Sequence, residues 1–460
     1  VSTNQQDWKG NRKYPKKNNN VKLSVNRKER EEDSKAVLKQ FDETFEDMLD
    51  FNSQDNQDQT DENLQRYHTI LSELGKKGNW KEAQKILTEI EDDSKIHPTV
   101  KTYSLMLYAW SRSDHPSAVH QMQQVWNRML KLSINDPTLK PNLRTVATFL
   151  LGISRNIDNV DDKNMKLEIS KTASALLSEI KELGGDLKPD AELYTLVMVC
   201  LSKIGTLDTV NKVEELMQEL KHEYKESGFE QSLAPTYHTY TTLIGAWGRS
   251  IGSKASDRAL ELLEEMEQIH EKQKMDSEEP LDIYRTTKPS MYTYICVLHC
   301  LTRSNGSAKQ ALDLLLKMRE ISKEDPDLTP TLRCYNLAIE CCARTDDRFF
   351  SKTAAAKIAF AILKVIEKEE GMTANNRTYN RLIRVVCNLL PPGPQRNEVG
   401  AKIIEKAKNE GQVTPDIIDL IHSGFDPDFA NELLKSNVTN EDSFTSNENP
   451  QTWSRNGKSN

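Results

Sequence analysis

The sequence predicts an all-α fold, a right-handed superhelical solenoid of about eight antiparallel helix-pair repeats. One short pattern recurs along the chain: an aromatic residue, a small or polar residue, and then an apolar stripe at helical spacing. Each copy is followed by a turn and a second amphipathic stretch. The composition agrees, because 29% of the 460 residues are charged and only 18 are Gly and 17 Pro, which favours helices joined by loops.

The first stretch of each repeat begins with an aromatic anchor. Clear copies read TYSLMLYAWSRS from Thr102, TYTTLIGAWGRS from Thr239 and TYNRLIRVVCNL from Thr378. Successive anchors are separated by 36 residues (67 to 103) at the shortest and 54 (240 to 294) at the longest, and we expect the loops to absorb this variation while the helices keep their length. The anchors are Tyr67, Tyr103, Val146, Tyr194, Tyr240, Tyr294, Tyr335 and Tyr379. A ring that occurs once per repeat could stack on a base, but we expect these rings to pack one unit against the next.

The second stretch of each repeat is rich in Lys and Glu on one face. Examples are WKEAQKILTEI from Trp80, DRALELLEEMEQI from Asp257 and SAKQALDLLLKM from Ser307. A loop with a proline usually leads to the next anchor, as at Pro98, Pro141, Pro189, Pro235, Pro289 and Pro330. A single helix pair cannot bury both of its faces, so the pairs must stack, with the first helices on a concave surface and the second helices on the other.

Composition divides the chain into three parts. We expect residues 1–62 to be a largely disordered polar flank, residues 63–436 to be the helical repeat solenoid, and residues 437–460 to be a disordered polar tail. The net charge of -8 is unevenly spread, because residues 1–30 carry a balance of +7 and residues 31–62 a balance of -10. The repeat region is therefore near neutral, and the overall charge does not decide the partner.

The seven cysteines are odd in number and lie inside helical apolar patterns, which indicates a reduced intracellular compartment. Cys296, His299 and Cys300 fall within one turn of a helix and could suggest a metal site. Because there are only three ligands and no partner motif with zinc spacing, we interpret them as small core residues.

Several copies in phase resemble the pentatricopeptide repeat. The best matches are KPDAELYTLVM from Lys188, APTYHTYTTLIGAW from Ala234 with ALELLEEM from Ala259, and TPTLRCYNLAI from Thr329. The resemblance covers about residues 63–436, and the segment from Asp416 to Lys435 is expected to be a closing helix.

The resemblance implies that each repeat reads one base of single-stranded RNA. Two residues would do so, the one after the anchor and the last one before the next repeat. On this sequence the pairs are His68 with Thr99, Ser104 with Asn142, Ala147 with Asp190, Thr195 with Thr236, Thr241 with Ser290, Ile295 with Thr331, Asn336 with Asn375, and Asn380 with Asp416. Amides and hydroxyls can donate to and accept from a base edge, whereas Ala147 and Ile295 cannot. The last two pairs resemble pyrimidine readers, and Ser104 with Asn142 resembles a purine reader.

A second row of residues stands two positions before each anchor. It comprises Gln65, Lys101, Arg144, Glu192, His238, Tyr292, Arg333 and Arg377. Cations and rings on one surface offer phosphate contacts and stacking, the two terms that drive single-strand binding. An arginine at a helix N-terminus also opposes the helix dipole, which indicates a functional reason for Arg144, Arg333 and Arg377.

These patterns favour single-stranded RNA binding in organellar RNA processing, stability or translation. The alternative is a tetratricopeptide-like scaffold that binds protein partners on the same architecture. We expect no catalytic residues, no metal or other cofactor, no small-molecule substrate and no membrane span. A location in the mitochondrion or plastid is implied by the resemblance alone, since the chain starts at Val1 and the lack of a targeting segment carries no information.

Overall fold

The structure of the chain is a computed structural model that describes residues 62–93, 96–184, 187–250, 254–276, 287–303, 307–346 and 351–435. All regular elements in these ranges are α-helices or short 3-10 helices, and no strand occurs among them, so the all-α prediction is confirmed. Apart from Glu62, the two polar flanks lie outside the described residues, and their predicted disorder stays a prediction. No helix in the described ranges is both long and apolar enough to span a bilayer.

The helices alternate between first and second members of a pair. The first helices are α2 (Glu62–Lys76), α4 (Val100–Ser111), α6 (Leu143–Asp158), α8 (Ala191–Ser202), α10 (Tyr237–Arg249), α12 (Met291–Leu301), α14 (Leu332–Ala343), α16 (Asn376–Leu389) and α18 (Pro415–Gly424). The second helices are α3 (Trp80–Asp92), α5 (Ala118–Ser133), α7 (Lys163–Leu183), α9 (Leu207–Glu226), α11 (Ala255–Asp276), α13 (Ala308–Ile321), α15 (Lys352–Lys368), α17 (Pro394–Asn409) and α19 (Pro427–Lys435).

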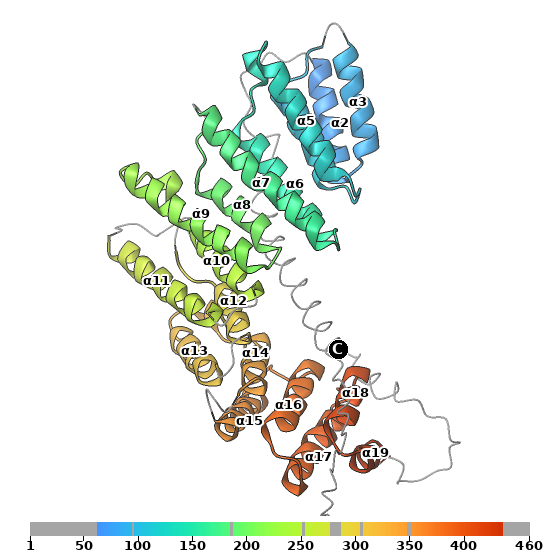
Figure 1. The fold of residues 1–460 in the computed structure, drawn as a ribbon, viewed down its shortest axis with the longest axis vertical. Coiled ribbons are helices and arrows are strands. Elements are labelled where there is room, and N and C mark those ends of the chain that lie inside the picture. Colours follow the sequence, from blue (N-terminus) through green and yellow to red (C-terminus); the bar gives the residue numbers. More distant parts are fainter. Residues whose placement is uncertain are drawn as a thin grey trace, which may run out of the picture.

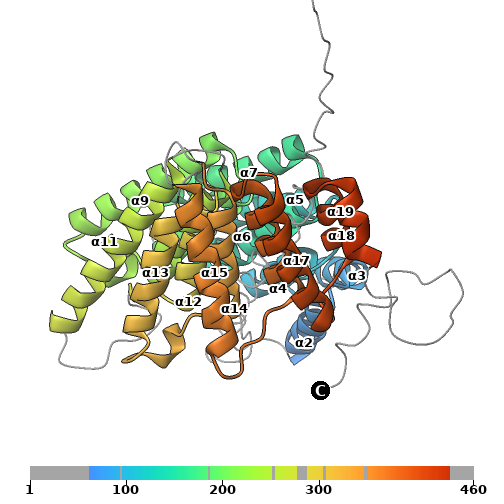
Figure 2. The same ribbon diagram turned by 90° about the horizontal axis from the view of Figure 1, so that it is seen from below.

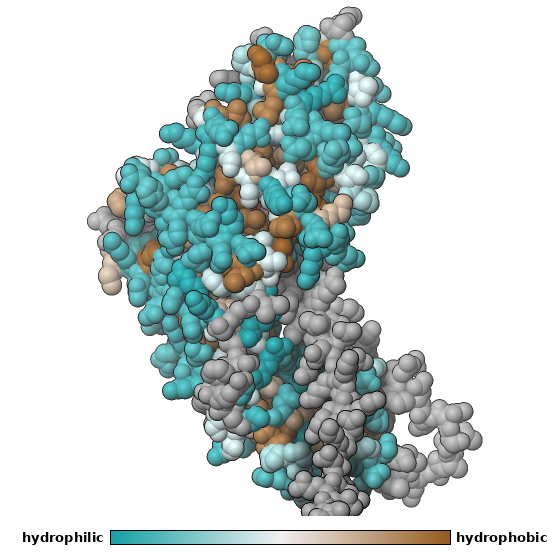
Figure 3. Space-filling view, viewed as in Figure 1, coloured by the Kyte–Doolittle hydropathy of each residue, from teal (hydrophilic) through white to brown (hydrophobic). Residues whose placement is uncertain are grey.

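The pairs stack in chain order, from α2 and α3 at the top of Figure 1 to α18 and α19 at the bottom. Each first helix packs against the first helices before and after it, whereas neighbouring second helices touch each other much less. Because the first helices are closer together, the array curves towards them, and they form its inner layer. In the view along the long axis (Figure 2), α9 and α11 lie at the outer edge and α4 and α6 nearer the centre. The outer helices present mostly hydrophilic side chains with smaller apolar areas between them (Figure 3).

Two expectations about lengths were wrong. The second helices do not keep one length, because α3 has 13 residues and α11 has 22. The extra turns of α11 end in the polar segment HEKQKMD, whose helix-forming Lys, Glu and Gln extend the helix beyond the packed core. The closing segment is also not a single helix, since α18 ends at Gly424 and α19 begins at Pro427.

The anchor tyrosines form the core of the inner layer. Tyr103, Tyr194, Tyr240, Tyr294, Tyr335 and Tyr379 are each at most 2% exposed, and Val146 replaces the ring in α6 without exposure. Tyr67, in α2, is only partly buried and packs against the same core. The interpretation of these rings as packing anchors is therefore confirmed, and the six buried rings cannot stack on a base in this conformation.

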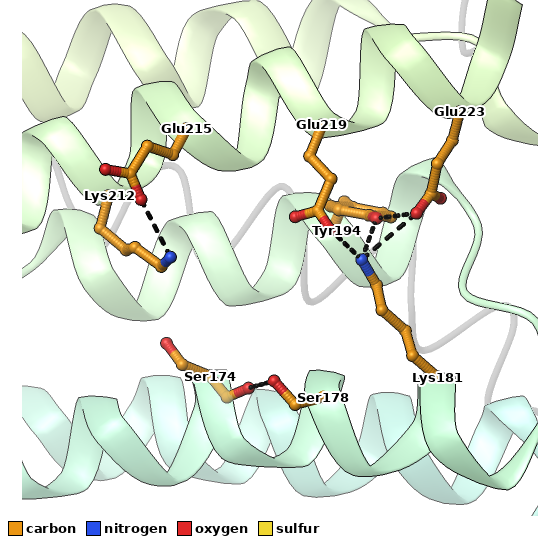
Figure 4. Close-up of polar contacts among 8 residues, drawn as sticks. All are labelled: Ser174, Ser178, Lys181, Tyr194, Lys212, Glu215, Glu219 and Glu223. Carbon is orange, nitrogen blue, oxygen red and sulfur yellow. Dashed lines mark hydrogen bonds and ion pairs between the residues drawn. The ribbon is translucent and has the colours of Figure 1, made fainter. Parts of the chain in front are cut away.

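The hydroxyl groups of the anchors connect the inner and outer layers. The Tyr194 hydroxyl donates a hydrogen bond to the Glu223 carboxylate on α9 at 2.7 Å, and Lys181 from α7 lies within ion-pair distance of the same carboxylate (Figure 4). This group of tyrosine, glutamate and cation recurs as Tyr103 with Glu91 and Arg128, Tyr240 with Glu265 and Lys221, Tyr294 with Glu267 and Lys317, and Tyr379 with Glu410 and Lys406. Each group therefore joins one first helix to one or two second helices.

We expect Glu265→Gln to lower the free energy of unfolding by about 1 kcal/mol, because it weakens a charge-assisted hydrogen bond from Tyr240 and an ion pair with Lys221. Glu264→Gln on the exposed face of the same helix is the control and should change it by less than about 0.5 kcal/mol. Urea unfolding followed by circular dichroism measures both. Equal effects of the two substitutions would show that the Tyr240 group does not stabilise the array.

Candidate nucleic-acid interface

The inner face is defined by the first-helix positions that neighbouring helices leave accessible. In α10 the only partly exposed residues are His238, Gly245 and Arg249, and every other described residue of that helix is buried. Together with Thr241, which is 6% exposed, they recur at intervals of three or four residues on one side of the helix. Counted from the anchor Tyr240, they stand two residues before it and one, five and nine residues after it. We call them the N-terminal row, the reader row, the middle row and the C-terminal row.

From His68 to Asn336 the reader row is almost fully buried between adjacent first helices, whereas Asn380 is partly exposed. The Ser104 hydroxyl lies 2.9 Å from the Thr145 hydroxyl of the next first helix, Thr195 lies 2.9 Å from Thr239, and Thr241 lies 2.8 Å from Thr293. His68 makes the same contact through Nε2, 2.8 Å from the Thr102 hydroxyl. In each case the partner is the residue just before the next anchor. We call these contacts the hydroxyl bridges.

The predicted partners of the reader residues are the N-cap residues of the following first helices. Asn142 accepts hydrogen bonds from the Thr145 amide and hydroxyl, both at 2.9 Å, and Asn375 accepts from the Thr378 amide at 3.0 Å. Thr99, Asp190, Thr236, Ser290 and Thr331 occupy the same N-cap position. A side-chain oxygen at this position satisfies an amide that the helix itself leaves unpaired, which explains why only Asn, Asp, Ser and Thr occur there.

The predicted pairs are brought together in most repeats. Asn336 donates directly to Asn375 across 3.4 Å. Ser104 and Asn142 both contact Thr145, and Thr195 and Thr236 both contact Thr239. His68 with Thr99, and Thr241 with Ser290, are joined in the same way through Thr102 and Thr293.

The last predicted pair differs from the others. The N-cap of α18 is Thr414, and Asp416 stands two residues further on, in the first turn of the helix and exposed. Asp416 therefore belongs to the N-terminal row rather than to the N-cap positions. The reason is Pro415, which lacks an amide hydrogen and occupies the first helical position, so that the cap falls on the residue before it.

The two reader residues that cannot form hydrogen bonds face apolar partners. Ala147 is followed by Leu193 at the bridging position of the next repeat, and Ile295 is followed by Cys334. All four side chains are buried. Polar residues therefore meet polar residues and apolar residues meet apolar residues at the junctions from α2 to α16, whereas at the last junction the partly exposed Asn380 is followed by the buried Ile417 at the bridging position of α18.

The N-terminal row is more exposed than the reader row. Lys101, Arg144 and Arg333 are partly exposed, and Arg377 is exposed. His238 packs its ring on Tyr237 with 3.8 Å between ring centroids, and burial lowers the pKa of His238 to about 4, so its imidazole is neutral at physiological pH. Burial raises the pKa of Tyr292. These two residues therefore offer rings rather than charges.

The C-terminal row is a set of cations that was not among the predicted residues. Its signal is a Lys or Arg nine residues after the anchor in every repeat from α2 to α14, with Asn388 in α16. The members are Lys76, Arg112, Arg155, Lys203, Arg249, Arg303 and Arg344. Arg155 and Arg249 donate to the hydroxyls of Ser111 and Ser202 in the preceding first helix, at 3.5 and 3.4 Å. Two members form ion pairs: the buried Lys203 ammonium with Asp158 at 2.7 Å, and Arg344 with Glu340 at 2.8 Å.

Of the residues considered for a metal site, the two cysteines are part of the core, whereas His299 is partly exposed in the middle row of α12. Cys296 and Cys300 are buried, and the Cys300 thiol donates to the Ile244 carbonyl oxygen. Burial raises the pKa of Cys296 to about 11, which disfavours the thiolate that a metal requires. Within the part of the chain that the structure describes, no group of three or more potential ligands could hold a metal ion.

A double-mutant cycle tests the hydroxyl bridges. Thr195→Val and Thr239→Val should each destabilise the protein. The double variant should cost less than their sum by about 1 kcal/mol, because each single variant already loses the bridge, which the double variant loses only once. Thr148→Val combined with Thr239→Val is the control, since Thr148 bonds within its own helix. Additive unfolding free energies for Thr195 and Thr239 would contradict the bridge.

Comparison with known proteins agrees with the repeat architecture. Residues 56–112 match the family model described as the pentatricopeptide repeat domain. The described part of this match contains α2, α3 and α4, that is, one helix pair and the next first helix. A search of curated proteins finds no match. The chain is thus a helical repeat protein with a pentatricopeptide repeat match at residues 56–112.

Proposed function

We propose that the inner face of the first helices binds single-stranded RNA and that the chain acts by binding rather than by catalysis. The observation that carries this proposal is the position of the cations. Lys101, Arg144, Arg333 and Arg377 lie in the N-terminal row. The cations of the C-terminal row lie eleven residues further along the chain than that row, near the ends of the first helices from α2 to α14. At 1.5 Å per residue the two rows are about 16 Å apart, so they bracket the reader row from both sides. Cations at both edges would bind the phosphate backbone and leave the bases over the middle.

The reader row would then supply base contacts in some repeats. A bridging hydroxyl has one proton and two acceptor lone pairs. The Ser104 and Thr195 hydroxyls also donate to carbonyl oxygens of their own helices and are each 2% exposed, so a base would reach them only where adjacent first helices separate. Ser104, Thr195 and Thr241, with their N-cap partners Asn142, Thr236 and Ser290, are the proposed hydroxyl readers. Asn336 with Asn375, and Asn380, are the proposed amide readers. The repeats of Ala147 and Ile295 would bind the backbone without reading a base.

We further propose that the RNA is organellar and that binding affects its processing, stability or translation. This part rests on the pentatricopeptide match and on the charge pattern of the inner face. A scaffold for protein partners is the alternative function. Recovery of the chain with a stoichiometric protein partner after ribonuclease treatment would favour the scaffold, whereas crosslinking in cells followed by sequencing of the bound RNA would identify the RNA.

Arg155→Gln combined with Arg249→Gln should weaken RNA binding and reduce its salt dependence. Loss of two phosphate contacts should lower the slope of log affinity against log salt by about 1.4, at about 0.7 per contact for a single strand. Fluorescence anisotropy with a mixed-sequence 20-nucleotide RNA at several KCl concentrations measures this slope.

The matched control is Arg319→Gln, which removes an exposed cation from the second helix α13 and should leave the slope unchanged. If the wild-type chain has no affinity for RNA at low salt, or if Arg319→Gln and the inner-face variant have the same effect, RNA binding by this face is wrong.

A further inference from the structure

The last repeats carry a cluster of arginines around one buried carboxylate. Glu340, in the middle row of α14, is 6% exposed. Arg344, the C-cap residue of α14, donates to it through Nε at 2.8 Å, and Arg381 from α16 approaches it through Nε at 3.6 Å. Arg384, in the middle row of α16, is the third arginine whose charge acts on this carboxylate. We call these four residues the Glu340 cluster.

The cluster has an excess of positive charge. The three arginines hold the pKa of Glu340 below its usual range against the opposing effect of burial, so Glu340 is a carboxylate at neutral pH. Three guanidinium groups and one carboxylate leave two positive charges in a site where Glu340 and Arg381 are both more than nine-tenths buried. The Nε atom of Arg384 is buried and has no hydrogen-bond partner among the described residues. An anion with two negative charges would balance this site.

The charge of the inner face changes sign directly beyond the cluster. Positions two and five after the N-cap hold Arg377 and Asn380 in α16 but Asp416 and Asp419 in α18. Both aspartates are exposed. The other charged or titratable groups of the inner face nearby are His299 and Arg303, in the first helix before α14, and Arg333 on α14 itself. A phosphate backbone that follows the cations along the groove would meet two carboxylates at α18 and be repelled there.

We propose that the Glu340 cluster binds the terminal phosphate of the RNA strand and that α18 ends the groove. The inference rests on the proposed function, because it requires RNA on the inner face. A phosphomonoester at the end of a strand carries a charge of about -1.5 to -2 at neutral pH, whereas an internal phosphodiester carries only one negative charge. The excess of two positive charges therefore favours the terminal group, and the carboxylates of α18 oppose continuation of the strand.

The test compares one 20-nucleotide RNA in three forms, with a 5′-phosphate, with a 3′-phosphate, and with hydroxyls at both ends. For the full chain, one phosphorylated form should bind about tenfold more tightly than the hydroxyl form, because new charge-assisted hydrogen bonds form at one end only. Which form binds more tightly identifies the strand polarity.

For the variants, the readout is the affinity for the tighter-binding phosphorylated form divided by the affinity for the hydroxyl form. Arg384→Gln should reduce the ratio to near one, and Arg384→Lys should restore part of it. Arg249→Gln, a cation of the C-terminal row far from the cluster, should weaken both forms and keep the ratio. Equal binding of all three forms by the wild-type chain would overturn the inference. A ratio that is unchanged by Arg384→Gln would overturn it as well. Neither result would contradict RNA binding itself. Failure of every form to bind would instead refute the proposed function.

Discussion

The contact between successive first helices is the constraint on which the rest of the structure depends. At most junctions a residue just after one anchor meets the residue just before the next, as Thr241 meets Thr293. The second of these residues also takes part in the cap of its own helix, as Thr293 does with Ser290. The bridge therefore fixes the register between neighbours at the same place where the helix begins. Because first helices pack closely and second helices do not, the array curves and acquires an inner face.

The helix caps, the hydroxyl bridges and the proposed base contacts use the same residues. This restricts which amino acids can occur at those positions. A reader residue that changes from polar to apolar would remove the bridge partner of a buried hydroxyl in the next repeat and leave that hydroxyl only its bonds to the cap of its own helix, unless that residue changes as well. The junctions of Ala147 with Leu193 and of Ile295 with Cys334 show both changes together. Apart from Asn380, which is followed by Ile417 at the bridging position of α18, the proposed base contacts are thus confined to junctions that are already polar. The cations are free of this constraint, because their rows lie at the edges of the inner face. Affinity can therefore be spread along the array while selectivity is limited to some repeats.

The sequence predicted the fold from periodicity alone, and the structure confirms the helix pairs and the tyrosine anchors. The cap role of residues such as Asn142 was not predicted, because a cap is recognised only once the first helical residue is known. The shift at Asp416 follows from a proline that starts a helix, whereas the earlier prolines precede the cap. The C-terminal row can be seen in the sequence as a Lys or Arg at a fixed distance from the anchors. Its location on the inner face could not be predicted, because that location depends on how far each first helix extends. The length of α11 was missed because its polar end is helical without being packed.

Crosslinking of the purified chain to RNA that contains 4-thiouridine, followed by mass spectrometry of the crosslinked peptides, tests the central claim most directly. If the inner face binds RNA, the crosslinks should fall on the N-terminal and reader rows and near the C-terminal row, in several successive first helices from α4 to α16. The second helices, such as α9, α11 and α13, should remain free of crosslinks. Crosslinks concentrated on those outer helices would contradict the account, because they would place the RNA on the opposite surface of the array.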